Sequence, residues 1–227
     1  MKLPNETKAG QAVHGKWYHD ACGTAFGLEL VGERWSLLVV RELMLGPRRF
    51  SDLRASLPGI SAKILTERLA TLGANGIVVR RDLPPPVRAQ VYELTPYGHA
   101  SEPLIQELGR WAAKSPLHDP TLPLSPVSFM LSLRTMFDPE RARGWTARIG
   151  FRFPADRFAI AMADGAVPVE RGSTDGCDAV FVADEAPPLA AIFYGGAEPE
   201  DVGVVVEGDR AVADRFAAIF ELPGKIV

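Results

Sequence analysis

The sequence predicts an α+β protein in which a helix–turn–helix with a β-hairpin comes first and an antiparallel sheet covered by helices follows. Residues 47–94 carry the pattern of the first part, and runs of alternating large and small apolar residues from 157 onward carry the second. Four prolines, at positions 116, 120, 123 and 126, lie between the two parts. A chain of 227 residues exceeds a typical domain of about 100–150 residues, so two domains are expected.

The chain is expected to begin with an arm and two helices. Residues 1–19 are polar with scattered apolar positions and predict an N-terminal arm. Residues 20–31 and Glu33–Leu45 predict two helices separated by Gly32. The helical spacing around Trp35 indicates a core residue.

Residues Pro47–Leu57 and Ser61–Leu72 predict two further helices joined by a tight turn. Ser51 and Ser61 are each placed to cap one of these helices. The turn consists of Pro58–Ile60, where proline and glycine restrict or free the backbone dihedral angles. Two helices connected in this way can hold one helix against DNA while the other braces it.

The second of these helices has an apolar and a polar face. The apolar positions recur at i, i+4 and i+7 and are Leu65, Leu69 and Leu72. Lys63, Glu67 and Ala70 fall on the opposite side, with Thr66 and Thr71 on its flanks. This face is short and polar, so a major groove can admit it. Lys63 and Thr66, in the first turns, are the best candidates to contact base edges.

A β-hairpin is expected directly after the helix–turn–helix. Ile77–Asp82 and Gln90–Leu94 predict its strands, and a loop with three prolines carries Arg88 at the tip. A hairpin in this position is a wing. Arg80 and Arg81 point to opposite sides of a strand, so at most one of them faces DNA well.

Positive charge is concentrated in the same region. The net charge is −3, but residues 1–114 carry 15 Lys+Arg and 11 Asp+Glu, and the remainder carries 10 and 17. The two halves therefore have charges of +4 and −7, and a basic cluster suffices to neutralise phosphates. The candidate DNA contacts are Arg48, Arg49, Ser51, Ser61, Lys63, Thr66, Glu67, Arg80 and Arg88. For each basic residue simple solvation is the alternative, and for Ser61 it is helix capping.

The N-terminal half resembles the HxlR-type winged-helix regulators. The resemblance covers about residues 20–113 and is carried, in order, by Gly32–Leu38, Leu45–Leu53, Ile60-Ser61, Leu65–Leu69 and Tyr92–Thr95. It implies a dimeric, sequence-specific transcription factor that binds double-stranded DNA. It also implies a sensing role for Cys22, because some members use a cysteine at the start of the first helix to detect oxidants or electrophiles. A half-buried small apolar residue is the alternative interpretation of Cys22.

A long helix over Tyr97–Lys114 is expected to end the N-terminal domain, which would span residues 20–114. Leu104, Leu108 and Trp111 form an apolar stripe on this helix that belongs either to the core or to a contact with a second copy. The resemblance favours dimerisation through this helix and the first one. Residues 115–127 are expected to be a proline-rich linker.

Residues 128–227 predict the second domain. Strands are expected at Arg157–Ala163 and Ala166–Gly172, joined by the hairpin signal Asp164-Gly165, and at Ala179–Ala183 and Val202–Glu207. Helices are expected after Asp184, which can serve as a cap, and after Gly208-Asp209.

This half resembles the sterol carrier protein-2 fold over about residues 128–222. The resemblance is carried by Asp164-Gly165, Glu170–Gly172, Asp178–Ala183, Leu189, Gly195-Gly196 and Val206–Asp209. It implies a tunnel for an apolar molecule between sheet and helices. The residues that would line the tunnel are Phe129, Phe158, Ile160, Met162, Phe181, Phe193, Phe216 and Phe220. A packed core is the alternative interpretation of the same residues.

Motifs for catalysis, cofactors or metals do not occur in the sequence. It has no nucleophile elbow, zinc-protease, Walker A or dinucleotide fingerprint, and its four histidines follow no metal-ligand spacing. We therefore expect no enzyme, no catalytic residues, no cofactor and no metal. No apolar run approaches the roughly 18 residues that span a bilayer, and the N-terminus lacks the apolar stretch of a signal peptide. We expect a cytoplasmic protein without a membrane partner.

These patterns predict a dimeric DNA-binding transcriptional regulator whose C-terminal domain binds an apolar effector or extends the dimer. The alternative is a lipid or acyl-chain carrier in which the winged helix serves only for dimerisation or docking.

Overall fold

The chain forms two compact units. The computed structural model describes residues 18–85, 88–163 and 165–226. The first unit contains the residues up to Ala100 except Met44–Gly46, and the second contains Met44–Gly46 and everything from Ser101 on. Most of the predicted N-terminal arm, residues 1–19, lies outside the described residues.

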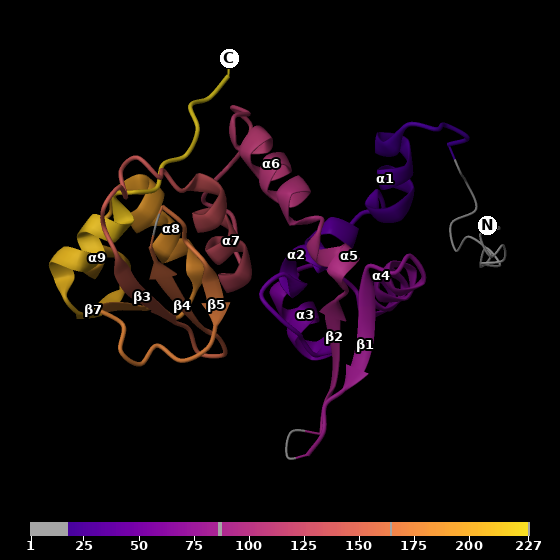
Figure 1. The fold of residues 1–227 in the computed structure, drawn as a ribbon, viewed down its shortest axis with the longest axis horizontal. Coiled ribbons are helices and arrows are strands. Elements are labelled where there is room, and N and C mark those ends of the chain that lie inside the picture. Colours follow the sequence, from indigo (N-terminus) through magenta and orange to yellow (C-terminus); the bar gives the residue numbers. More distant parts are fainter. Residues whose placement is uncertain (1–17, 86–87, 164, 227) are drawn as a thin grey trace, which may run out of the picture. The chain divides into compact units, whose positions relative to one another are not determined.

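The first unit is a helix–turn–helix followed by a β-hairpin (Figure 1). Its elements are α1 (Gly23–Val31), α2 (Ser36–Leu43), α3 (Phe50–Ser56), α4 (Ala62–Ala74), β1 (Val78–Asp82), β2 (Gln90–Leu94) and α5 (Pro96–His99). The strands β1 and β2 pair antiparallel, with Arg80 opposite Tyr92. Apolar residues at helical spacing make the core, among them Val39, Leu43, Leu53, Leu65 and Leu72, all without exposed surface. The winged helix–turn–helix predicted from the sequence is confirmed.

The helix expected over Tyr97–Lys114 is interrupted. The chain forms α5, then turns at Ala100-Ser101, and continues as α6 (Glu102–Ala113). α6 packs on α7 (Pro126–Met136). Arg134 forms an ion pair with Glu102 at 2.6 Å, and Arg110 donates a hydrogen bond to the carbonyl oxygen of Thr135 at 2.5 Å. These contacts place α6 in the second unit, whereas the sequence predicts a boundary after residue 114.

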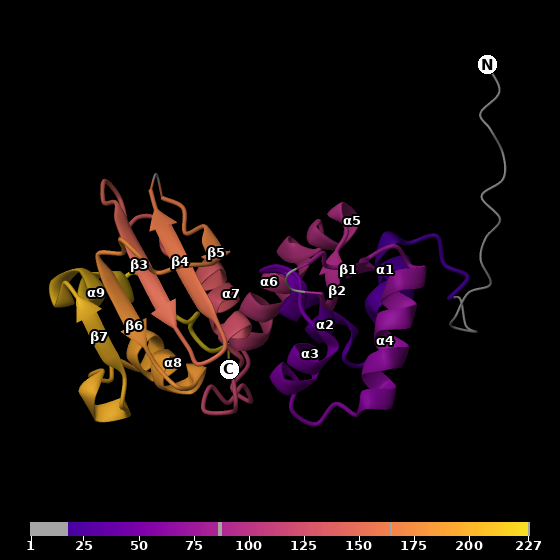
Figure 2. The same cartoon turned by 90° about the horizontal axis from the view of Figure 1, so that it is seen from below.

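The second unit is a five-stranded sheet with helices. Besides α6 and α7 it contains β3 (Ala147–Arg152), β4 (Arg157–Met162), β5 (Val169–Arg171), β6 (Ala179–Val182), α8 (Ala186–Gly195), the 3-10 helix η1 (Glu200–Val202), β7 (Val205–Gly208) and α9 (Arg210–Ala217). The strand order is β5-β4-β3-β6-β7, which can be followed in Figure 2. Rings from α7, α8 and α9 contact the rings of β3 and β6, so these helices cover the same face of the sheet.

The sheet is mixed, so the prediction of an antiparallel sheet is wrong at one pairing. β3 and β6 run parallel, while the other neighbours run antiparallel. The connection from β5 to β6 passes β4 and β3, so β6 pairs with β3 on the side opposite to β4. Thr174 in this connection is buried and lies against Gly150 of β3, where an added Cβ atom would come within 2.9 Å of the threonine side chain.

One local prediction in this unit also needs correction. The N-cap of α8 is Glu185 rather than Asp184, and it makes no capping hydrogen bond through its side chain. The last helix, α9, follows Gly208-Asp209 as expected, and Asp209 is its N-cap, because its carboxylate accepts hydrogen bonds from the N–H groups of Ala211 and Val212. Asp164 of the predicted hairpin signal lies outside the described residues, but Ala163 and Ala166 on either side form a bridge.

In the part of the chain described here, no helix has the length and apolar character needed to cross a bilayer.

Candidate nucleic-acid interface

The turn between α3 and α4 fixes where the second helix begins. Gly59 has φ of +89°, a left-handed conformation that glycine adopts without strain, and the N–H of Ile60 donates to the carbonyl oxygen of Leu57 at 3.1 Å. The hydroxyl of Ser61 then accepts a hydrogen bond from the N–H of Ile64 at 3.2 Å, so Ser61 is the N-cap of α4, as predicted.

α4 buries its apolar stripe and exposes its polar side. Leu65, Leu69 and Leu72 are buried, whereas the exposed residues are Lys63, Thr66, Glu67 and Ala70. The hydroxyl of Thr66 donates to the carbonyl oxygen of Ala62 at 2.9 Å. Thr71, which the sequence placed on the flank of the polar face, is 2% exposed and belongs to the core. The two residues favoured for base contacts, Lys63 and Thr66, are therefore accessible in this unit.

Two contacts hold α4 against the corner between α1 and α2. The side-chain amide of Asn75 donates to the carbonyl oxygen of Leu30 at 3.1 Å, and the Arg68 guanidinium lies 3.4 Å from the Glu33 carboxylate. Trp35 is half-buried beside the turn, where a Cβ atom added to Gly59 would lie 3.9 Å from its ring. Trp35 has φ of +79°, which a bulky residue rarely adopts. The ion pair with Glu33 gives Arg68 a structural role.

At the start of α3 one of the candidate side chains is buried and two are exposed. Arg48 is 8% exposed, its backbone pairs with that of Tyr92, and its guanidinium donates to the Ser56 hydroxyl at 3.0 Å. This burial removes Arg48 from the candidate DNA face. Arg49 and Ser51 are exposed. Ser51 does not cap α3; the carboxylate of Asp52 instead accepts a hydrogen bond from the N–H of Arg49 at 3.3 Å.

The wing carries arginines in different environments. Arg81 forms an ion pair with Glu93 at 2.7 Å, so its charge is partly compensated. Arg80 is exposed, and so is Arg88 in the loop between β1 and β2. Arg88 has φ of +33°, and the N–H of Leu83 donates to the carbonyl oxygen of Ala89 across the base of this loop at 2.8 Å. Among the described residues, Arg49, Lys63, Arg80 and Arg88 form no ion pair, and their charges are available to an anionic partner.

Cys22 occupies the N-cap position of α1 and is exposed. The N–H group of Thr24 lowers the pKa of the thiol most, and the N–H of Ala25 and the hydroxyl of Thr24 lower it further. Depressed pKa and access are the two conditions for thiolate reactivity, and the sequence could reveal neither.

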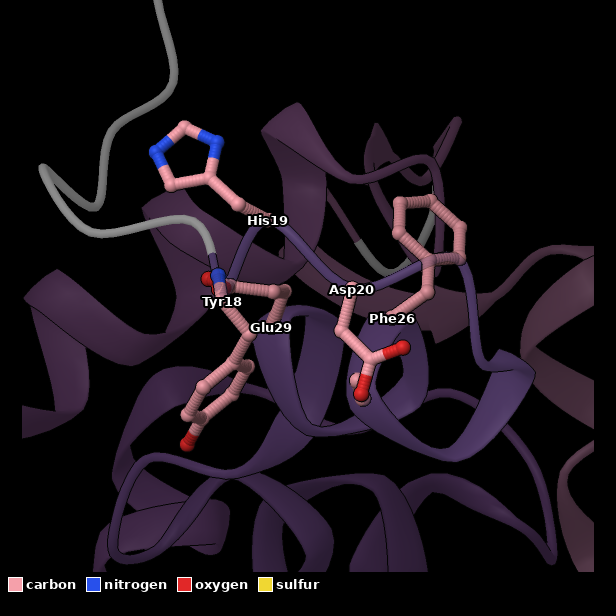
Figure 3. A pocket seen from close by; sticks show the side chains of 6 residues that line it. Tyr18, His19, Asp20, Phe26 and Glu29 are labelled. Carbon is pink, nitrogen blue, oxygen red and sulfur yellow. The ribbon is translucent and has the colours of Figure 1, made fainter.

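A surface pocket next to Cys22 was not anticipated from the sequence. It has a volume of about 270 Å³ and is lined by Tyr18, His19, Asp20, Ala25, Phe26 and Glu29. The N–H of Tyr18 donates to the Glu29 carboxylate at 2.5 Å. In Figure 3 the rings of His19 and Tyr18 point to opposite sides. The pocket is lined by two aromatic side chains and two carboxylates among others, and these residues form no sequence motif by which it could have been identified.

The residues proposed to line an apolar tunnel in the second unit are buried in its core. Phe129, Phe158, Ile160, Met162, Phe181, Phe193, Phe216 and Phe220 are all at most 4% exposed. The phenylalanine rings among them pack on one another. The ring centroid of Phe193 lies 5.3 Å from that of Phe129 and 5.2 Å from that of Phe181, and the centroids of Phe216 and Phe220 lie 5.0 Å apart. Phe151 of β3, which sequence reasoning missed, stacks on Phe181 at 5.3 Å. Ring contacts this close are typical of core packing.

Comparison with known proteins gives matches to the N-terminal part of the chain. A family model described as HxlR-like helix-turn-helix matches residues 30–118. The HTH-type transcriptional regulator YvaP of Bacillus subtilis is 39% identical over 88 residues, which are 38% of this chain and 81% of YvaP. The HTH-type transcriptional regulator YodB of the same species is 42% identical over 83 residues, or 37% of this chain and 74% of YodB. The structure of reduced YodB is 37% identical, with a TM-score of 0.39 over 43% of this chain and 98% of that one.

Proposed function

The chain belongs to the HxlR-like helix-turn-helix family, and from that premise we propose that it binds double-stranded DNA as a homodimer, with α4 in the major groove and the wing against the backbone. Members of this family are transcriptional regulators and not enzymes. The observation that carries the proposal is the exposed polar face of α4, together with exposed arginines of the wing and of the start of α3 that form no ion pair with any described residue. We also propose a cytoplasmic location, because the HTH-type relatives are named as transcriptional regulators, which act on DNA.

Each exposed residue of this face has a proposed role. Lys63 and Thr66 contact base edges, because they lie in the first turns of α4. Arg88 contacts a phosphate from the wing, and Arg49 contacts one from the start of α3. Ser61 is primarily a cap. Ser51, Glu67 and Arg80 are exposed as well and remain proposed DNA contacts.

Two exposed apolar surfaces support the proposed dimer. In the part of the chain that the structure describes, no residue of α1 is buried, and Phe26 and Leu28 are 46% and 51% exposed. On α6, the predicted stripe of Leu104, Leu108 and Trp111 is exposed as well. Large apolar side chains grouped on one helix face, as on α6, are typical of an interface. Two copies would place two α4 helices about one DNA turn apart on a palindromic site.

Selection from a random duplex library, followed by affinity measurements on the selected site at several salt concentrations, tests the proposal. Lys63→Ala is expected to weaken binding to the selected site by about 1–3 kcal/mol and to relax the preference at one position. Arg88→Ala is expected to weaken binding to all sequences and to reduce the slope of log affinity against log salt by about 1. Arg157→Ala, an exposed arginine of β4, is the matched control. Unchanged affinity and slope in both variants would show that the assigned face is wrong.

We also propose that the second unit is a sterol carrier protein-2-like domain that senses an apolar effector. Support comes from the helices α7, α8 and α9 over one sheet face with an aromatic interior between them. An effector would have to displace rings that now contact one another. It would regulate DNA binding only by favouring one arrangement of the two α4 helices of the dimer. Native mass spectrometry of the purified protein checks this. A co-purifying lipid combined with no DNA binding at low salt would favour the carrier alternative.

A second mode of regulation, by oxidants or electrophiles at Cys22, is favoured by the exposure and lowered pKa of its thiol. Cys22→Ser is expected to retain DNA binding and to lose the response to an oxidant such as diamide. A variant that still responds would exclude this role for Cys22.

A further inference from the structure

The exposed face of α4 presents one cation and one anion, and neither is neutralised. Lys63 and Glu67 lie one turn apart and are both exposed. No described residue forms an ion pair with either of them, and they form none with each other. A lysine four residues before a glutamate is the less favourable order for a helical ion pair, which is consistent with their separation.

A free carboxylate on this face weakens DNA binding if the face contacts only phosphates. Glu67 would lie beside a polyanion, and like charges brought together weaken binding. The carboxylate contributes favourably only when it accepts hydrogen bonds from donors on the bases. Its position on α4 beside Lys63 and Ala70, rather than on the wing, points it to base edges.

The chemistry of the two side chains specifies which bases they can contact. In the major groove a carboxylate accepts from the N4 amino group of cytosine, and a lysine donates to O6 and N7 of guanine. Four residues of an α-helix advance about 6 Å, and successive base pairs are about 3.4 Å apart. Contacts from Lys63 and Glu67 therefore fall within about two base-pair steps of each other.

On the proposed function rests our further inference: we propose that Lys63 and Glu67 together read one or two adjacent G·C pairs in each half-site, Lys63 through guanine and Glu67 through cytosine. Thr66 between them has its hydroxyl proton committed to the carbonyl oxygen of Ala62, so it offers a base only an acceptor or its methyl group. The other exposed residues of this side, Ala62, Ala70 and Ala74, are small and permit a close approach to the base pairs.

Selection of sites from a random duplex library by the full chain and its variants tests this assignment. The unmodified protein is expected to enrich a motif with neighbouring guanine and cytosine. Glu67→Ala is expected to lose the cytosine preference by about tenfold, the equivalent of about 1.4 kcal/mol, while its affinity for random duplex stays equal or rises. Lys63→Ala loses the guanine preference and also affinity. Glu185→Ala, an exposed carboxylate in the second unit, is the matched control and leaves the motif unchanged.

A base analogue separates a direct contact from a structural effect of the substitution. Replacing the selected cytosine with 2-pyrimidinone removes the 4-amino group, and it is expected to weaken binding of the unmodified protein about tenfold more than that of Glu67→Ala. If Glu67→Ala enriches the same motif with the same base frequencies, or the analogue weakens both proteins equally, the inference is overturned while the proposed function stands. If the unmodified protein enriches no motif, both are overturned.

Discussion

At the scale of single residues, the two cysteines have opposite surroundings. The thiol of Cys22 is exposed, and the hydrogen bonds at the start of α1 lower its pKa. Burial raises the pKa of the Cys177 thiol, and neighbouring Arg148 offsets this only in part. The thiolate is the reactive form, so the two side chains should differ strongly in chemical reactivity at neutral pH.

We expect iodoacetamide to modify Cys22 faster than Cys177 near neutral pH, since exposure and a lowered pKa both increase the amount of accessible thiolate at Cys22. Because the pKa of Cys22 is lowered, its reactivity should persist to a lower pH than that of a free cysteine and decline as pH falls through its pKa. Mass spectrometry of peptides from timed reactions measures both rates. The denatured chain is the control, in which the two rates should converge. Equal rates in the folded protein would contradict the assignment.

At the scale of elements, α4 depends on a cap and on its contacts with the α1–α2 corner. Ser61 satisfies one of the N–H groups that the first turn of a helix leaves without a partner. Ser51 is exposed in the first turn of α3 and caps nothing through its hydroxyl, which donates to Asp52 at 3.1 Å. The two serines therefore make a matched pair.

Ser61→Ala is expected to lower the free energy of unfolding by about 1 kcal/mol, because the capping hydrogen bond is lost. Ser51→Ala should change the free energy of unfolding by less than about 0.5 kcal/mol. Urea unfolding followed by far-UV circular dichroism compares them. Equal losses would mean that Ser61 does not cap α4.

Sequence patterns predicted some of these elements well and others poorly. The spacing of Leu65, Leu69 and Leu72 predicts α4 and its buried face, because a helix with one apolar stripe has a single way to face a core. β3 was missed, although Ala147, Ile149 and Phe151 alternate with polar residues or glycine.

Other features had no signal in the sequence. An arginine before a helix suggests a phosphate contact, and only the fold shows that Arg48 is enclosed by β2 and Ser56. The break after α5 also depends on tertiary contacts, since α6 is fixed by Arg134 and Thr135 of α7.

At the scale of the whole molecule, the exposed stripe of α6 is the surface where a second copy would bury the largest apolar side chains. Trp111 is 71% exposed, with Leu104 and Leu108 beside it on the same face. The opposite side of α6 is occupied by its ion pair and hydrogen bond to α7. A charge introduced into the stripe should therefore disturb assembly more than folding.

Leu108→Glu is expected to raise the dimer dissociation constant about a hundredfold or more, because an unpaired buried charge costs about 3 kcal/mol. Analytical ultracentrifugation over a range of concentrations measures the change, and circular dichroism checks that the fold is retained. Leu117→Glu, at a residue 91% exposed, is the control and should sediment like the unmodified protein. A Leu108→Glu variant that also does so would exclude this face from the dimer.

The nine residues of α1 bury no side chain in the described chain, and so short a helix is only marginally stable alone, since isolated helices below about 12–15 residues are marginal in water. Its formation should then be coupled to self-association. Amide protons of Gly23–Val31 are expected to exchange with solvent more slowly as protein concentration rises, while those of α4 keep a constant rate. Dilution would then unfold the helix that Cys22 caps, so the reactivity of this thiol would depend on the concentration of the protein in the cell. Exchange rates independent of concentration would show that α1 needs no second chain.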